Sequence, residues 1–208
     1  MPRASRTVFV SLILWLAQVF AAGAAAAAPS ILVFGDSLSS AYGIAQSRGW
    51  VALLDARLKR EHKNYNVVNA SISAETTRGG LARMPKVLAQ VKPKVVVLQL
   101  GSNDGLRGLP VAQMEQNLAA MIEQARRAGA RVLLVGGKLP PNWGPEYTEA
   151  FERAFARLAE KYRVALLPFL FADLEDSERH FQPDRLHPNE AAQPILLDTV
   201  WAKLATLL

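Results

Sequence analysis

Short apolar runs alternate with amphipathic stretches along most of the chain, and this alternation limits the fold more than any other feature. Apolar residues between the runs recur at helical spacing, as in Trp50, Leu54 and Leu58. Strands that alternate with helices predict a parallel sheet covered on both faces. We therefore expect an α/β protein, a three-layer α/β/α sandwich with a five-stranded parallel sheet. The expected strands are residues 31–34, 65–69, 95–100, 131–135 and 164–167.

Four longer amphipathic segments indicate further helices. Residues 77–90 form the first, and Pro85 within it is expected to kink or restart the helix. A longer helix follows Pro110, which suits a first helical turn, and Gly129 suits its end. Two more helices are marked by apolar residues within 151–162 and 195–204.

The first 28 residues differ in composition from the rest of the chain. Arg3 and Arg6 give a positive start, an apolar run extends from Val8 to about Phe20, and small residues lead to Ala28. These are the three parts of a secretory signal peptide. A membrane-spanning helix is the alternative, because the apolar stretch is near the length that spans a bilayer. We expect a cleaved signal peptide at 1–28, a single domain at 29–208, a periplasmic or secreted product, and no stable membrane span after cleavage.

The composition excludes some other functions. The chain has 208 residues and no cysteine, so the core must stabilise it without disulfides. Loss of Arg3 and Arg6 with the signal would lower the formal net charge from +6 to +4. The remaining charges are mixed along the helices, with no basic stripe interleaved with aromatic residues. Nucleic-acid binding is therefore not expected.

A serine and a histidine follow expected strands, where ligands of parallel sheets bind. Ser37 comes after the first strand; its hydroxyl is a weak nucleophile without a base, and alone it could equally cap a helix. His187 comes after the last strand, three residues beyond Asp184. On a tight turn this spacing lets the carboxylate accept from the imidazole Nδ1–H, which leaves Nε2 free to deprotonate Ser37.

Two other segments could supply hydrogen-bond donors. Asn103 follows the third strand within Gly101–Gly105, and its amide could stabilise an oxyanion. On this segment alone a plain turn is the better interpretation, because Asn-Asp-Gly is typical of turns. Residues 69–76 follow the second strand, and their backbone N–H groups could add a donor. A metal site is a weaker interpretation because no third ligand accompanies Asp184 and His187, and we expect neither metal nor cofactor.

Together these segments resemble the SGNH/GDSL hydrolase superfamily, in particular its acyl-CoA thioesterase I / lysophospholipase L1 / arylesterase branch. The resemblance extends from Ile31 to the C-terminus and implies a flavodoxin-like SGNH hydrolase fold. It is carried by blocks that read Phe34-Gly35-Asp36-Ser37-Leu38-Ser39, Leu100-Gly101-Ser102-Asn103-Asp104-Gly105 and Asp184-x-x-His187-Pro188-Asn189.

The resemblance also implies a role for each site residue. Ser37 would be the nucleophile, His187 the general base and then acid, and Asp184 its orienting partner. The oxyanion hole would consist of the backbone N–H groups of Ser37 and Ala74 and the amide of Asn103. The family usually has glycine where this chain has Ala74, and the extra methyl costs roughly 1–2 kcal/mol only if the backbone needs a positive φ.

The expected function is that of an exported serine esterase acting on small acyl esters and thioesters, with lysophospholipids among the candidate substrates. Residues 106–110 and 139–144 are expected to rim its pocket. A carbohydrate O-acetylesterase of the same superfamily is one alternative. A non-catalytic periplasmic binding protein is another, although such a protein would have no chemical need for Ser37, Asn103, Asp184 and His187 together.

Overall fold

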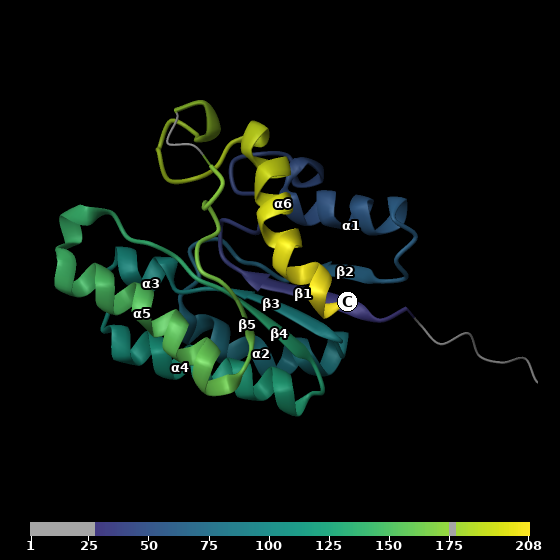
Figure 1. Cartoon of the computed structure of the whole chain (residues 1–208), viewed down its shortest axis with the longest axis horizontal. Helices are drawn as coiled ribbons and strands as arrows, with labels where there is room; N and C mark the ends of the chain where they lie inside the picture. The colour runs from purple at the N-terminus through teal and green to yellow at the C-terminus, as the bar shows by residue number, and fades with distance from the viewer. Residues whose placement is uncertain (1–27, 175–177) are drawn as a thin grey trace, which may run out of the picture.

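The computed structural model describes residues 28–174 and 178–208 and shows a parallel sheet between two layers of helices (Figure 1). The expected signal peptide, residues 1–28, lies outside the described part apart from Ala28. The sheet has the order β2-β1-β3-β4-β5 and every neighbouring pair is parallel. Its strands are β1 (Ser30–Gly35), β2 (Asn66–Asn69), β3 (Val95–Gln99), β4 (Arg131–Val135) and β5 (Ala165–Leu167). The expected fold class and all five expected strands are therefore confirmed.

The helices divide between the two faces of the sheet. Those on one face are α1 (Trp50–Arg60) and α6 (Gln193–Leu204). Those on the other are α2 (Thr77–Val91), α4 (Val111–Arg127) and α5 (Pro145–Tyr162), with the short α3 (Ser102–Leu106) at the end of β3 (Figure 1). Within the described residues, none of these helices combines the length and the apolarity needed to cross a bilayer.

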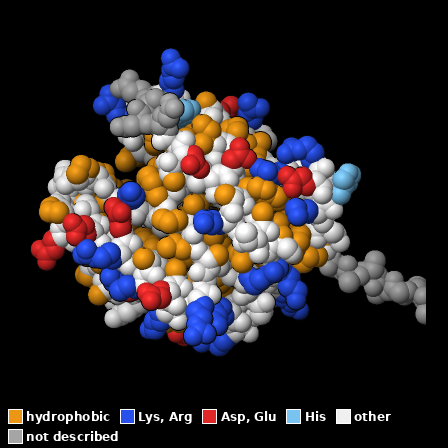
Figure 2. All heavy atoms as spheres, in the orientation of Figure 1, with side chains coloured by type: hydrophobic (Ala, Val, Ile, Leu, Met, Phe, Trp, Pro, Cys, Tyr) orange, Lys and Arg blue, Asp and Glu red, His pale blue; other side chains and the backbone are white. Residues whose placement is uncertain are grey.

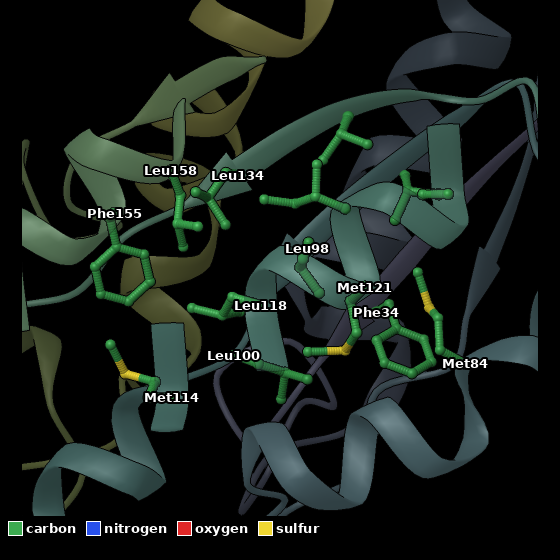
Figure 3. Packing of buried hydrophobic residues seen from close by; sticks show 14 of the residues in the cluster. Phe34, Met84, Leu98, Leu100, Met114, Leu118, Met121, Leu134, Phe155 and Leu158 are labelled. Atoms are coloured by element: carbon green, nitrogen blue, oxygen red, sulfur yellow. The ribbon is translucent and has the colours of Figure 1, made fainter. Parts of the chain in front are cut away.

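Successive residues of the central strands enter opposite layers of the core. In β1, Leu32 and Phe34 pack under α2 and α4, whereas Ile31 and Val33 pack under α1 and α6. All four side chains are fully buried, which explains why this strand shows no alternation of polar and apolar residues. Figure 3 shows the first of these layers, in which Phe34, Leu98 and Met121 meet. This packing holds the carboxyl ends of the strands in fixed positions.

Two local expectations differ from the structure. The segment 77–91 is one continuous helix with Pro85 inside it, so a restart at Pro85 is wrong, whereas a kink there stays a prediction. Met84 and Leu88 on the same helix are buried against the sheet, and this packing holds the helix together across the missing N–H of the proline. The residues after β3 form the helix α3 instead of a plain turn. Gly129 follows α4 with φ 81°, as expected for the end of a helix.

Candidate active site

The carboxyl ends of β1 and β3 lie side by side and bring two of the expected site segments together. Gly35 pairs with Gln99 at the ends of the two strands. Ser37 lies two residues beyond β1, and Asn103 lies in α3 directly after β3. The segment with Asp184 and His187 returns to the same edge before α6 begins. Parallel strands thus place residues from distant parts of the chain at one edge of the sheet.

Ser37, His187 and Asp184 form a continuous hydrogen-bonded chain. The imidazole Nε2 of His187 lies 2.9 Å from Ser37 Oγ. Its Nδ1 lies 2.7 Å from Oδ2 of Asp184. With Nδ1 protonated towards the carboxylate, Nε2 is the acceptor that faces the hydroxyl. The serine proton therefore has a base within hydrogen-bonding reach, and the base has an orienting partner.

Asp184 is fixed by its own turn. Its Oδ1 accepts hydrogen bonds from the backbone N–H groups of Leu186 at 2.9 Å and His187 at 3.0 Å. Arg185, which lies between Asp184 and Leu186, has φ 58°, and the tight turn requires this conformation. The backbone N–H of His187, followed by its imidazole and the N–H of Leu186, lowers the pKa of Asp184 to about 2. The carboxylate therefore stays ionised at neutral pH and can stabilise an imidazolium on His187.

Asp36 is a buried carboxyl group that the sequence interpretation quoted in a motif but gave no role. Its Oδ1 accepts from the backbone N–H of Leu38 and from Gln99 Nε2, each at 3.0 Å. Its Oδ2 lies 3.3 Å from Asn103 Nδ2, which donates to it. Burial raises the pKa of Asp36 from 3.8 to about 6, against the lowering effect of these hydrogen bonds. Asp36 thus fixes the orientation of the Asn103 amide.

Gln99 is the single polar residue of the otherwise apolar strand β3, and its hydrogen bonds explain its presence there. Its Oε1 accepts from Ser39 Oγ at 2.7 Å and from the backbone N–H of Asp36 at 3.4 Å. Its Nε2 donates to Asp36, so this side chain ties the first site segment to β3. A polar residue at the carboxyl end of a buried strand was the sequence signal that could have identified this link.

Ala74 has a strained backbone. Its φ is 63°, so the condition under which the extra methyl is unfavourable is met. The carbonyl of Ala74 accepts from Arg107 Nη2 at 2.9 Å, which joins the loop after β2 to the segment after α3. Ala74 does not line the cavity described next. Its backbone N–H as an oxyanion donor stays a prediction.

A cavity of about 370 Å³ opens beside Ser37 and His187. Of the two loops expected to rim it, Leu106, Leu139 and Pro140 line the cavity, whereas Leu109 and Trp143 do not. Much of its wall comes from residues that the sequence interpretation missed: Gly136, Gly137, Phe169, Leu170, Phe171 and Phe181. The apolar run after β5 was the signal for part of this wall. The cavity has the size and the lining to hold an acyl chain.

Comparisons with known proteins identify relatives that match most of the chain. The model of the GDSL-like Lipase/Acylhydrolase family matches residues 33–194. The esterase TesA of Pseudomonas aeruginosa is 52% identical over 183 residues, which cover 88% of this chain and 91% of that protein. The thioesterase 1/protease 1/lysophospholipase L1 of Escherichia coli K12 is 41% identical, covering 88% and 86%. The crystal structure of the esterase EstA from Pseudoalteromonas sp., inhibited by monoethylphosphonate, has a TM-score of 0.82 at 39% identity, covering 85% and 97%.

Proposed function

The chain belongs to the GDSL-like Lipase/Acylhydrolase family and is an ester hydrolase, and from this premise we propose that it hydrolyses acyl esters and thioesters through an acyl-enzyme on Ser37. The single observation that carries the proposal is the hydrogen-bonded chain from Ser37 through His187 to Asp184. Ser37 and His187 of this hydrogen-bonded triad line an apolar cavity of about 370 Å³. A nucleophile, a base and room for an acyl group are what acyl transfer needs.

The first half of the reaction forms the acyl-enzyme. Ser37 Oγ attacks the carbonyl carbon of the substrate while His187 Nε2 takes the hydroxyl proton. The C–O or C–S bond of the tetrahedral intermediate then breaks, and the leaving alcohol or thiol takes that proton from His187. Asp184 stabilises the transient imidazolium. In the second half, His187 deprotonates a water that attacks the acyl carbon, and the proton returns to Ser37 as the acid leaves.

The negative charge that develops on the carbonyl oxygen of the tetrahedral intermediate must be stabilised by hydrogen-bond donors. We assign this role to Asn103 Nδ2 and the backbone N–H groups of Ser37 and Ala74. Support comes from Asp36, whose carboxyl accepts a hydrogen bond from Asn103, and both residues line the cavity. A preorganised donor of this kind typically contributes about 100- to 1,000-fold in kcat.

The apolar wall of the cavity favours acyl groups longer than acetyl. An acetyl group is too small to cover the apolar surface of this wall, which includes Phe169, Leu170, Phe171 and Phe181. A series of p-nitrophenyl esters of increasing chain length separates this proposal from a carbohydrate O-acetylesterase, because only the latter would act on acetyl esters alone. Signal-peptide cleavage and export are also part of the proposal, supported by the composition of residues 1–28.

The nucleophile and the base are tested by Ser37→Ala and His187→Ala. Both variants are expected to lose p-nitrophenyl ester hydrolysis while they keep the circular dichroism spectrum and melting temperature of the wild type. A fluorophosphonate probe is expected to label the wild type and not Ser37→Ala. Ser47→Ala and His62→Asn are matched controls at exposed positions away from the cavity and are expected to keep full activity. Near-normal turnover by either site variant would contradict the assignment.

A further inference from the structure

The exposed large hydrophobic side chains of the described residues all lie at one edge of the sheet. Each of the five segments that follow a strand contributes at least one of them, and no other large hydrophobic side chain of residues 28–174 and 178–208 is as exposed. We call this set the apolar rim: Tyr42, Ile72, Leu106, Leu109, Trp143 and Leu186. Their exposed fractions lie between 37% and 50%. Apolar surface gathered in this way marks an interaction site.

Three residues of the apolar rim lie at the catalytic cavity. Leu106 and Leu186 line the cavity itself. The ring of Tyr42 lies 4.4 Å from the imidazole of His187, measured between centroids. On the other side, Trp143 lies against Gly108, where an added Cβ would meet its ring at 3.1 Å. Figure 2 shows hydrophobic side chains, with acidic side chains beside them, at the left end of the molecule, where α5 begins in Figure 1. At Leu106 and Leu186 the apolar rim is therefore part of the wall of the acyl cavity.

Cations lie among these apolar side chains. Lys138 and Arg185 line the cavity, and the Nζ of Lys138 lies 5.5 Å from the ring centroid of Phe169. Arg107 follows Leu106 directly and is exposed. Acidic groups lie here as well: Asp184 is held by His187, Glu146 borders the hollow beside Trp143, and Glu149 pairs with Arg153. Exposed Trp and Leu beside Lys and Arg are the combination that enters the boundary between acyl chains and phosphate headgroups.

We propose that the apolar rim docks on the surface of aggregated anionic phospholipids and presents the cavity mouth to their acyl chains. The proposal rests on the proposed function and specifies the physical state of the substrate. Docking in this orientation lets an acyl chain enter between Leu106 and Leu186 without full exposure to water, so the cost of exposing it is avoided. The cations then contact headgroup phosphates around the mouth.

The amino edge of the sheet is the competing surface. It carries exposed cations such as Lys94 and Arg131, at the starts of β3 and β4, and Arg163 before β5. Many of these cations lie beside the C-termini of helices, where they stabilise the helix dipole, which is sufficient reason for their presence. Within the described residues this edge has no exposed large hydrophobic side chain to insert. Docking there would also turn the cavity away from the lipid.

The test uses the double variant Leu109→Ser/Trp143→Ser, because neither side chain lines the catalytic cavity. The probe is a vesicle of phosphatidylcholine with about one third phosphatidylglycerol. Wild-type protein is expected to co-sediment with the vesicles, and the variant about tenfold less, since two large apolar side chains no longer insert. Hydrolysis of a long-chain ester embedded in the vesicles should fall by about the same factor. Hydrolysis of monomeric p-nitrophenyl acetate should stay unchanged.

The matched control is Lys94→Ser/Arg131→Ser on the amino edge, which is expected to bind vesicles as well as the wild type at moderate salt. If this control loses binding while the rim variant keeps it, the amino edge is the docking surface and the proposal is overturned. Absence of vesicle binding by the wild type overturns it as well. Failure of the proposed function would be distinct, because the wild type would then not hydrolyse the monomeric ester at all.

Discussion

Asp36 shows how one buried residue serves the site at a cost to stability. Its carboxyl is fully buried and accepts from Gln99 and Asn103, so it orients the amide that we assign to the oxyanion hole. A buried carboxylate costs free energy unless its hydrogen bonds compensate. The rise in its pKa to about 6 shows that the compensation is incomplete. A less costly residue at this position would orient Asn103 less well.

Asp36→Asn is therefore expected to lower kcat by about 10- to 100-fold with little change in KM. The new amide places a donor towards Asn103 Nδ2, so the two amides repel and Asn103 turns away from the oxyanion. The loss should not exceed that of Asn103→Ala, about 100- to 1,000-fold. Steady-state kinetics on p-nitrophenyl butyrate test whether the loss is in kcat and not in KM. A rise in KM at constant kcat would show that Asp36 acts on binding alone.

The same variant has a defined effect on the pH dependence of stability. The pKa of Asp36 is raised from 3.8 to about 6, so between these pH values the folded protein holds a proton that the unfolded chain has released. Wild-type stability therefore falls as pH rises through this window, by up to about 3 kcal/mol. Asp36→Asn lacks this titration. The difference in unfolding free energy between Asp36→Asn and the wild type, measured by urea denaturation, should therefore increase from pH 4 to pH 7. A difference that does not change with pH would contradict the titration of a buried Asp36.

At the scale of elements, buried strands were the most predictable feature of the chain. β4 has the expected bounds, and β1 and β3 agree to within one residue at each end, because both faces of these strands are buried and their apolar runs are unbroken. The helix α3 was not predicted as a helix, since a single turn is too short to show a periodicity and Asn-Asp-Gly favours turns. The continuity of α2 through Pro85 depends on tertiary packing, which local propensity does not contain.

The sequence predicted the site residues whose side chains have a chemical role, but it did not predict the residues that form the wall of the cavity through packing. Ser37, Asp184 and His187 meet in the way that a nucleophile, a base and its partner require. The part of the cavity wall formed by Phe169, Phe171 and Phe181 was missed because these aromatic residues differ from core residues only in their positions in the folded chain. Which loop residues face a pocket is decided by tertiary contacts, as the separation of Leu139 from Trp143 illustrates.

Pro85→Ala is expected to stabilise the protein. Pro85 is exposed in the interior of α2, and alanine would restore a backbone N–H that can donate to the carbonyl of Leu81. Relief of the proline penalty, reduced by the greater freedom of the unfolded chain, should raise the unfolding free energy by about 2 kcal/mol. Urea denaturation measures this change. Lys86→Ala, at the next exposed position, is the control and should change stability by less than about 0.5 kcal/mol.

At the scale of the whole molecule, activity depends on how accurately the last segment of the chain is placed against the first strand. Ser37 and His187 are 150 residues apart in sequence. Gln182 connects their surroundings: its Nε2 donates to the carbonyl of Tyr42 at 2.8 Å and to that of Pro188 at 3.2 Å. Its backbone N–H donates to the carbonyl of His187 at 2.8 Å. Gly43 leaves the space for this side chain, because a Cβ there would lie 2.1 Å from Gln182 Oε1.

Gln182→Met keeps the length of the side chain and removes the two hydrogen bonds that Nε2 donates, so the segment around His187 should move relative to Ser37. A displacement of a fraction of an ångström weakens the hydrogen bond between the base and the nucleophile, and we expect kcat to fall by about tenfold. The unfolding free energy should fall by only about 1 kcal/mol. Gln116→Met on the exposed surface of α4 is the matched control. Fluorophosphonate labelling well below the melting temperature separates the two effects: slower labelling of a fully folded variant identifies Gln182 as a positioning residue, and wild-type labelling would restrict it to stability.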